Sequence, residues 1–488
     1  MQAVSRRQAL LLGGFGMAAT AAGSAGLVWT LTSREHPVTG RELTQPPEER
    51  SANGQLQVRL EAAPGQMLLA GQQAAALGYN GSIPGPTLRV RPGDILRIGL
   101  VNNLAQATNL HVHGLHVSPE GSGDNVFVSV DPGDTFDYEY KLPADHPPGV
   151  YWYHPHHHGM VADQIFAGLF GAIIVEDPER IDSSVERVLV ISDTTLDGLG
   201  NIAAVPEMDR MMGREGDLIL VNGQSNPQLT ARPGQRERWR IINACAARYL
   251  RLRLDGQQLQ LLGMDSGRFP TPKTLDELLL TPGNRADLLV TAATGDSALR
   301  AFYQDQGTME GMMRPRRGTR SPADQPDGAA LATLRVAGEP IASLTAVPTL
   351  RGLGDLRSAS VAARRQIILA AGMGMGMGGG MMRFTINGRE FDETRTDTTV
   401  AAGDVEEWTL TNTSPMDHPF HLHVWPMQII EENGQGTDTA IWQDVVNVPA
   451  NGHVKVRIAF KDFSGRSVYH CHILDHEDLG MMGVIEVR

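Results

Sequence analysis

With 488 residues, 41% of them hydrophobic, the chain is too long for one hydrophobic core and predicts about three globular domains. Its formal net charge of -13 argues against nucleic acid or an anionic membrane surface as a partner. There are only two cysteines, Cys245 and Cys471, so metal binding by Cys471 would leave no internal disulfide.

Residues 1–34 are predicted to be an export segment that takes no part in the fold. Ser5-Arg6-Arg7-Gln8-Ala9-Leu10 is a twin-arginine pattern, and sequence rich in Leu, Gly and Ala follows it. We therefore expect the twin-arginine translocation machinery as a partner and a periplasmic or otherwise exported protein. No charge occurs between Arg7 and Arg34, so an uncleaved membrane anchor is the alternative.

The rest of the chain contains three related units. They begin at Asn80-Gly81, Asn222-Gly223 and Asn387-Gly388, and each continues into runs in which polar and apolar residues alternate. Repeats spaced this widely indicate duplicated domains, not a solenoid. Short alternating runs broken by Asn-Gly and Pro-Gly turns are typical of antiparallel β-sandwiches. We expect an all-β chain with domains at residues 50–178, 179–340 and 360–488.

Four His-x-His pairs follow one another along these units. They are His111/His113, His154/His156, His421/His423 and His470/His472. In a strand, residues two apart point to the same face, so each pair presents two imidazoles together. Two pairs fall in the first unit and two in the third, which would let eight imidazoles meet between these domains. A structural zinc takes four ligands and a catalytic zinc three, so this number favours several copper ions.

The last pair brackets Cys471, which in a strand points to the opposite face from His470 and His472. One strand can then contact two metal sites, one on each side of its sheet. A thiolate, imidazoles and a downstream thioether form the ligand set of a blue-copper site. In an extended chain His418 faces away from His421, and it could join Cys471.

Four segments resemble the motifs of the multicopper oxidases, above all the bacterial three-domain laccase-like and copper-tolerance enzymes. They are His111-Val112-His113-Gly114, Trp152-Tyr153-His154-Pro155-His156, His418-Pro419-Phe420-His421-Leu422-His423, and the segment from His470 to Met481. The resemblance implies three cupredoxin-like Greek-key β-sandwich domains and four copper ions. It also implies an enzyme, expected to be a monomer, that couples four one-electron oxidations of substrate to the reduction of O2 to two waters.

The resemblance also implies the ligands of each ion, with a trinuclear cluster between the first and third domains. One copper, of type 1, would be bound by His418, Cys471, His476 and Met481. A type 2 copper would be bound by His111 and His421. The type 3 pair would take His113, His154 and His472 on one ion and His156, His423 and His470 on the other. Two further histidines, His157 and His158, follow the second pair and depart from the motif.

Two carboxylates resemble the acidic residues that the family uses for proton delivery near its O2 site. Asp124 follows the first His-x-His pair in a Gly-rich loop, and Glu477 follows His476 directly. The alternative is that the first is a turn aspartate and the second a solvated glutamate.

The reductant is predicted from a Met-Gly segment that includes Met373, Met375 and Met377. Thioethers suit Cu(I), and Met416 with Asp417, immediately before His418, could complete a substrate site. We therefore expect oxidation of Cu(I), and also of phenols, with a role in copper tolerance. A laccase acting mainly on aromatic reductants is the alternative, in which the Met-Gly segment is a flexible connector. A copper-free cell-envelope scaffold is disfavoured because every ligand position is filled.

Overall fold

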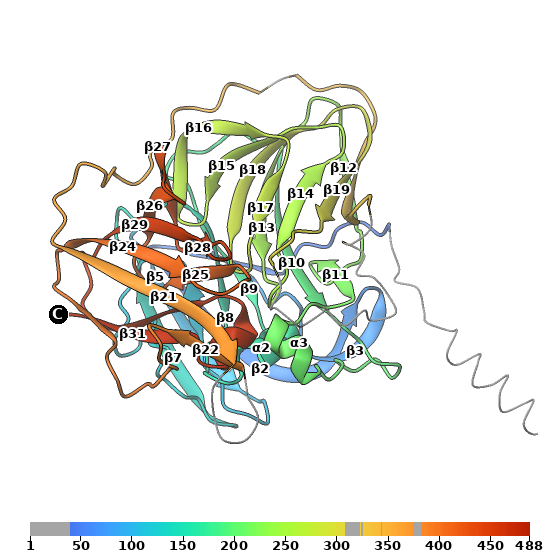
Figure 1. Ribbon diagram of the computed structural model, residues 1–488. Helices are drawn as coiled ribbons and strands as arrows, with labels where there is room; N and C mark the ends of the chain where they lie inside the picture. Colours follow the sequence, from blue (N-terminus) through green and yellow to red (C-terminus); the bar gives the residue numbers. More distant parts are fainter. Residues whose placement is uncertain (1–39, 308–322, 324–325, 343, 374–381) are drawn as a thin grey trace, which may run out of the picture. The chain divides into compact units, whose positions relative to one another are not determined.

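The structure, a computed structural model, describes residues 40–307, 323, 326–342, 344–373 and 382–488 (Figure 1). The predicted export segment lies outside the described residues. No helix in the described part of the chain is both long enough and apolar enough to cross a membrane. Strands dominate the described residues, and they form six sheets.

The first domain contains a four-stranded sheet in the order β3-β2-β5-β7 and a five-stranded sheet in the order β1-β4-β9-β8-β6. Its strands are β1 (Glu48–Arg50), β2 (Gln55–Leu69), β3 (Gln72–Tyr79), β4 (Thr87–Val90), β5 (Ile95–Asn102), β6 (His111–His113), β7 (Thr135–Lys141), β8 (Gly149–His154) and β9 (Gly171–Val175). A short helix, α2 (Val161–Phe166), lies between β8 and β9.

The second domain contains a six-stranded sheet in the order β11-β10-β13-β18-β15-β16 and a five-stranded sheet in the order β12-β20-β19-β14-β17. Its elements are β10 (Val185–Thr194), α3 (Glu207–Met212), β11 (Leu218–Val221), β12 (Gln228–Ala231), β13 (Arg236–Asn243), β14 (Leu250–Leu254), β15 (Leu259–Met264), β16 (Gly267–Leu275), β17 (Leu278–Leu280), β18 (Arg285–Thr291), β19 (Gly295–Phe302) and β20 (Ala329–Val336).

The third domain has sheets in the orders β22-β21-β24-β29-β26-β27 and β23-β31-β30-β25-β28. Its elements are β21 (Ala363–Met373), β22 (Met382–Ile386), β23 (Thr398–Val400), β24 (Val405–Asn412), β25 (His418–Leu422), β26 (Met427–Glu432), β27 (Gln435–Gln443), β28 (Val445–Val448), β29 (His453–Ala459), β30 (Gly465–Cys471), α4 (Leu474–Asp478) and β31 (Met482–Val487). Along β24 and β29 every second residue is buried, the pattern expected of strands with one face on a core. The predicted all-β fold is confirmed, and the predicted domain limits remain predictions.

The three Asn-Gly repeats fold in the same way. In each pair both residues have positive φ, which suits a two-residue hairpin turn that few other residues tolerate. The asparagine side chain of each turn accepts a hydrogen bond from a backbone amide of an earlier strand, at 2.8 Å for Asn80, 2.9 Å for Asn222 and 2.8 Å for Asn387. The repeat seen in the sequence is therefore a repeated structural unit, with one copy in each domain.

Candidate metal centres

The first candidate centre surrounds Cys471 at the end of β30. Its Sγ lies 3.4 Å from Nδ1 of His418 and 3.8 Å from Nδ1 of His476. The other ring nitrogens have protein partners, because Nε2 of His418 lies 2.7 Å from Ser414 Oγ and Nε2 of His476 donates to the Met211 carbonyl at 3.2 Å. These contacts turn Nδ1 of both rings toward the thiol. All three side chains are buried, and the set fits a blue-copper site.

Met481 lies on the side of the sheet that carries Cys471. Its backbone amide donates to the carbonyl of His476 at 2.9 Å, and its carbonyl accepts from the amide of Cys471 at 3.0 Å. Its side chain is buried in the same core cluster as Cys471. Met482 instead pairs with His470 across β30 and β31, and cross-strand partners share a face. The structure therefore favours Met481 over Met482 as the thioether of this centre.

The second candidate centre consists of eight buried histidines between the first and third domains. They come from β6, β8, β25, β30 and the residues that follow these strands: His111, His113, His154, His156, His421, His423, His470 and His472. In three triads the ligand atoms all lie within 4.8 Å of one another: His111 with His113 and His154, His111 with His421 and His423, and His156 with His423 and His470. The four predicted pairs thus meet at one place, as their distribution over the repeats suggested.

Several of these histidines lie close to the partners that the resemblance implied, and two of the three triads also bring His111 next to histidines of a type 3 set. Nε2 of His111 and Nε2 of His421 lie 3.4 Å apart, in the predicted type 2 pair. In the first type 3 set, Nδ1 of His113 lies 3.4 Å from Nε2 of His154, and the ring of His472 lies 4.9 Å from that of His113 between centroids. Which ion each histidine would hold remains a prediction.

Glu477 contacts the second type 3 set. Nε2 of His470 lies 3.1 Å from Nε2 of both His156 and His423. One oxygen of Glu477 lies 2.9 Å from Nδ1 of His470, and the other lies 3.3 Å from Nε2 of His156. The carboxyl is fully buried, and this burial raises its pKa to about 7 although His156 lowers it. Glu477 is therefore not a solvated surface group.

Asp124 orients the predicted type 2 ligand His111. Nδ1 of His111 donates to the Asp124 carboxylate at 2.8 Å, which leaves Nε2 as its free nitrogen. The same carboxylate accepts from the amide of Val112 at 3.0 Å and lies 3.6 Å from Nδ1 of His423. Burial raises the pKa of Asp124 to about 8. By these contacts, both predicted acidic residues, Asp124 and Glu477, lie next to histidines of the second centre.

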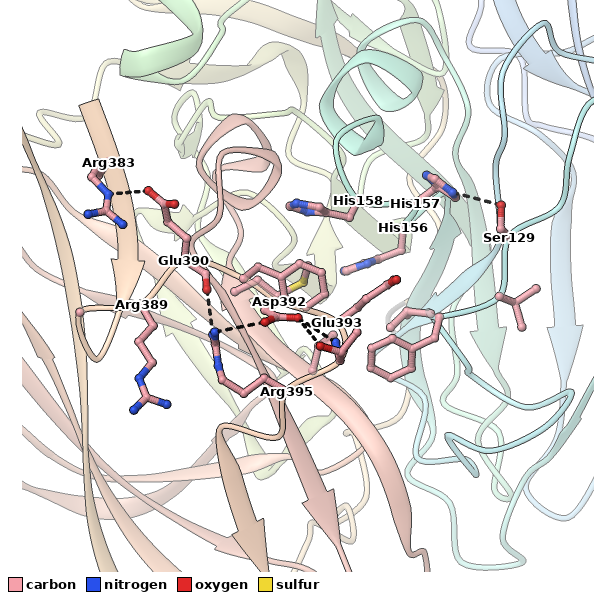
Figure 2. Close-up of a pocket in the computed structure, with 18 residues that line it drawn as sticks. Ser129, His156, His157, His158, Arg383, Arg389, Glu390, Asp392, Glu393 and Arg395 are labelled. Atoms are coloured by element: carbon pink, nitrogen blue, oxygen red, sulfur yellow. Dashed lines mark hydrogen bonds and ion pairs between the residues drawn. The ribbon is translucent and has the colours of Figure 1, made fainter. Parts of the chain in front are cut away.

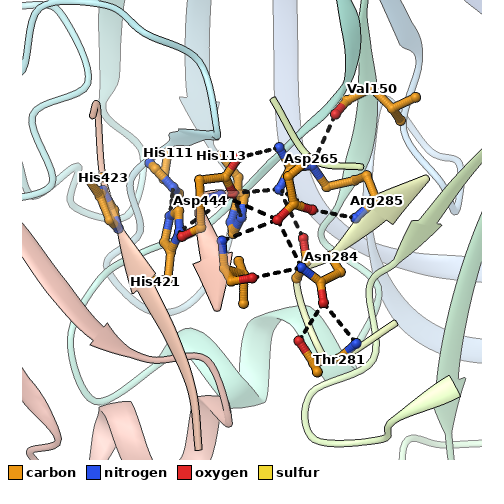
Figure 3. Close-up of polar contacts among 12 residues, drawn as sticks. His111, His113, Val150, Asp265, Thr281, Asn284, Arg285, His421, His423 and Asp444 are labelled. Carbon is orange, nitrogen blue, oxygen red and sulfur yellow. Dashed lines mark hydrogen bonds and ion pairs between the residues drawn. The ribbon is translucent and has the colours of Figure 1, made fainter. Parts of the chain in front are cut away.

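A third acidic residue at this centre, Asp444, was missed by the sequence analysis (Figure 3). Its carboxylate accepts from Nε2 of His113 at 3.1 Å, and its backbone carbonyl accepts from Nδ1 of His421 at 2.7 Å. These bonds fix Nδ1 of His113 and Nε2 of His421 as the free nitrogens. The available signal was Asp444 as the lone charge in the otherwise uncharged segment Ile441-Trp442-Gln443-Asp444-Val445-Val446, because a charge in such a segment is rarely buried without a partner.

Asp444 is held by a buried network that joins the three domains (Figure 3). Arg285 donates to its two carboxylate oxygens at 2.5 and 2.7 Å, and to the Val150 carbonyl of the first domain at 3.0 Å. Asp265 accepts from the amides of Arg285 at 2.9 Å and Val445 at 3.2 Å. The second domain, which supplies none of the predicted ligands, therefore positions histidines of the other two.

Burial keeps the candidate ligands uncharged, which metal binding requires of an imidazole. It lowers the pKa of His470 and His156 to about 4 and that of His476 to about 3. Both ring nitrogens of His472 lack a hydrogen-bond partner among the described residues. Burial also raises the pKa of the Cys471 thiol, so a thiolate there needs a compensating cation. The donor set fits copper ions at both centres.

A cavity of about 840 Å³ reaches the second centre at His156 (Figure 2). His157 and His158, the two histidines outside the motif, also line it; Nε2 of His157 lies 3.2 Å from Ser129 Oγ. The opposite wall is the charged segment between β22 and β23, in which Glu390 pairs with Arg383 of β22 at 2.6 Å. The cavity thus brings open space to the edge of His156, one of the eight histidines.

The predicted substrate residues are only partly placed. Met375 and Met377 lie outside the described residues, and β21 ends at Met373. Met416 is buried in the core of the third domain. The carboxylate of Asp417 accepts from the Ala450 amide at 2.8 Å and from a side-chain amide at 3.0 Å, so the fold already engages it.

The chain is similar to known families and to individual proteins. Three family models described as multicopper oxidase match residues 61–180, 188–315 and 370–488. A multicopper oxidase of Staphylococcus haemolyticus is 28% identical over 424 residues, which cover 84% of this chain and 83% of that protein. A protein of Proteus mirabilis named cell division protein FtsP is 27% identical and covers 93% of this chain and 94% of its own length.

Among solved structures, the chain is similar to a multicopper oxidase of Campylobacter jejuni described as a metallo-oxidase. The two are 32% identical, with a TM-score of 0.79 over 93% of this chain and 96% of that one. The predicted fold class, three cupredoxin-like β-sandwich domains, is thereby confirmed.

Proposed function

The chain belongs to the multicopper oxidase family, and we propose that it oxidises Cu(I), and more broadly phenols, with O2 as the electron acceptor. When bound, four copper ions would supply the redox chemistry, in which four one-electron oxidations of substrate are coupled to the reduction of one O2 to two waters. The observation that carries the proposal is the strand β30. Cys471 faces the first centre while its neighbours His470 and His472 face the second.

Cys471 gives the two centres a short covalent connection. The peptide bonds on either side of it lead directly to His470 and His472, so no other residue stands between the thiol and the histidine centre. A hydrogen bond from Nδ1 of His470 to the carbonyl of Cys471, at 3.0 Å, adds a second contact along the same path. We propose that these residues carry electrons from the first centre to the second.

Asp124 and Glu477 are proposed to supply protons where O2 is reduced. Burial raises their pKa to about 8 and about 7, so both carboxyls can hold a proton near neutral pH. One carboxyl oxygen of Glu477 lies 2.9 Å from Nδ1 of His470, and we propose that the cavity lined by His156 supplies water and a path for O2.

Electrons are proposed to enter at His476. Its Nε2 points to the carbonyl of Met211 in α3, and the ring of Phe384 stacks on it with centroids 4.2 Å apart. A reductant at this edge would therefore meet α3 and the chain around β22. The Met-Gly segment joins β21 to β22, which favours soft Cu(I) as a substrate.

The substrate is tested by replacing residues 374–381 with Asn-Gly. Met373 and Met382 are cross-strand partners, so a two-residue turn can join them without disturbing β21 or β22. We expect the steady-state rate with Cu(I) to fall at least tenfold while the rate with a phenol is retained. A full-length control with Met375→Leu and Met377→Leu separates the loss of sulfur from the loss of length. Unchanged Cu(I) oxidation in both variants would leave the laccase alternative.

A scaffold role without copper is the second candidate, because the chain is also similar to a cell division protein FtsP. The filled ligand positions and the unpartnered nitrogens of His472 count against it. Copper-loaded protein without the strong visible absorption of a copper–thiolate bond would favour the scaffold. For the oxidase, we also propose export, a periplasmic location, a role in copper tolerance and a monomeric state.

A further inference from the structure

The short helix α4 carries one residue for each centre. His476 faces Cys471 of the first centre, and the next residue, Glu477, contacts histidines of the second. In a helix of five residues almost no backbone group has a partner within the helix, so the helix cannot fix its own orientation. Contacts from other elements therefore decide how these two side chains lie.

The two residues that flank this pair are aspartates, and each is bound by a different domain. Asp478 accepts from backbone amides at and just before the start of α2 in the first domain, at 2.8 to 3.2 Å. Asp475 accepts from Arg214 of the second domain. Helices α2 and α3 both lie against α4 (Figure 1). This helix of the third domain is therefore held at each end by a neighbouring domain.

Arg214 binds both oxygens of the Asp475 carboxylate. Its Nη2 donates to one oxygen at 2.6 Å and its Nε to the other at 3.0 Å, and its backbone amide adds a bond of 3.0 Å. Nη1 donates to Asp163 of α2 at 2.6 Å. The side chains of Arg214 and Asp475 are each 3% exposed. Because the guanidinium is planar and engages both oxygens, this buried contact fixes direction as well as distance.

The segment that carries Arg214 also contacts His476 directly. Arg214 lies three positions after Met211, whose carbonyl accepts from Nε2 of His476 at 3.2 Å. Between them, Gly213 has a φ of +79°, and a Cβ there would come within 2.8 Å of two side-chain carbons. The segment is packed too closely to shift freely, so the contact that anchors Arg214 also anchors the Met211 carbonyl.

We propose that Arg214 is a positioning residue for the first centre: it holds Asp475 and thereby turns Nδ1 of His476 toward the thiol of that centre. Its own hydrogen bonds go to carboxylates, so it acts through α4 and not on a candidate ligand. The second domain then positions residues of both centres, since the Arg285 network holds the other. The inference rests on the proposed copper site at Cys471.

The first test uses copper-free protein, so its result does not depend on the proposed function. Arg214→Lys keeps a positive charge beside Asp475 but replaces the planar fork by a single ammonium group, so the variant should still fold. In its crystal structure we expect the ring of His476 to be turned. Its Nδ1 should lie farther from Cys471 Sγ than in the wild type, where the distance is 3.8 Å. A ring in the wild-type position would overturn the proposal.

The second test follows the first centre in copper-loaded protein, by its copper–thiolate absorption and by electron paramagnetic resonance. Loss of an outer partner of a metal ligand weakens metal binding about 10–100-fold. We expect the copper affinity of this centre, measured by competition with a chelator, to fall by at least the lower end of that range in Arg214→Lys, with a changed copper hyperfine coupling. A lower thermal midpoint alone, with affinity and spectrum unchanged, would show a merely structural role and overturn the proposal.

Arg210→Met is the matched control. Arg210 lies in the same segment and pairs with Asp163 at 3.3 Å, as Arg214 also pairs with it, but in the described structure its side chain has no hydrogen bond or ion pair with α4. Its spectrum and copper affinity should match the wild type, and changes as large as those of Arg214→Lys would overturn the proposal. Wild-type protein that binds no copper at Cys471 would refute the proposed function instead, and the copper-free structures would still decide the role of Arg214.

Discussion

Replacing Arg285 by Met should destabilise the enzyme strongly although this residue binds no metal. Arg285 is fully buried and neutralises Asp444 through two hydrogen bonds while lying 3.2 Å from Asp265. Methionine fills much of the same volume but leaves two buried carboxylates facing each other. Breaking a buried ion pair by removing one partner costs about 3–5 kcal/mol.

The expected loss can be measured as a thermal midpoint. A cooperative unit of roughly 150–250 residues loses about 2–4 °C per kcal/mol, so Arg285→Met should melt about 6–20 °C below wild type. The deficit should be smaller at pH 5 than at pH 8. Burial raises the pKa of Asp265 above its usual range although Arg285 lowers it. Removing the guanidinium raises this folded-state pKa further, so the variant loses more stability than the wild type as pH rises through it.

Arg300→Met is the matched control, since this arginine pairs with Asp255 at 2.8 Å on the surface. Exposed pairs contribute about 0–1 kcal/mol, so its midpoint should stay within about 4 °C of wild type. The assay is differential scanning calorimetry of copper-free and copper-loaded protein. If Arg285→Met melted as close to wild type as Arg300→Met does, the network would not hold the domains together as argued.

Three other predictions concern the centres themselves. Cys471→Ser should remove the intense copper–thiolate absorption and lower the bound copper by one ion while the fold persists; a coloured variant would contradict the assignment. Asp124→Asn should weaken copper binding or activity about 10–100-fold, because His111 loses the acceptor that orients it. An unchanged pH–rate profile would remove Asp124 from proton delivery. In copper-free protein, Glu477→Gln should stabilise more at pH 8 than at pH 5. Burial raises the pKa of Glu477 to about 7, so the wild type loses stability as pH rises from the unfolded-state pKa toward that value, and the glutamine variant does not. Thermal midpoints at the two pH values measure this, and equal gains would contradict it.

Several site contacts could be anticipated from the sequence because they depend on local geometry. Side chains alternate along a strand, so the opposed directions of Cys471 and His470 follow from adjacency alone. The same rule placed His418 with Cys471 and His421 with the other histidines, as the structure shows. Glu477 was expected beside a metal ligand, but its contacts with His156 and His470 depend on the packing of α4.

The sequence by itself determined the all-β class, the threefold repeat and the histidines that meet. Turn residues, the alternation of polar and apolar residues, and metal-ligand residue types can all be recognised within short segments. Only the tertiary structure decided which nitrogen of each imidazole is free. Asp444 engages Nε2 of His113, 331 positions away in sequence, and so leaves Nδ1 free. Arg285 of the second domain in turn holds Asp444. Such contacts depend on how finished domains pack, and a buried charge reveals its partner only when that packing is known.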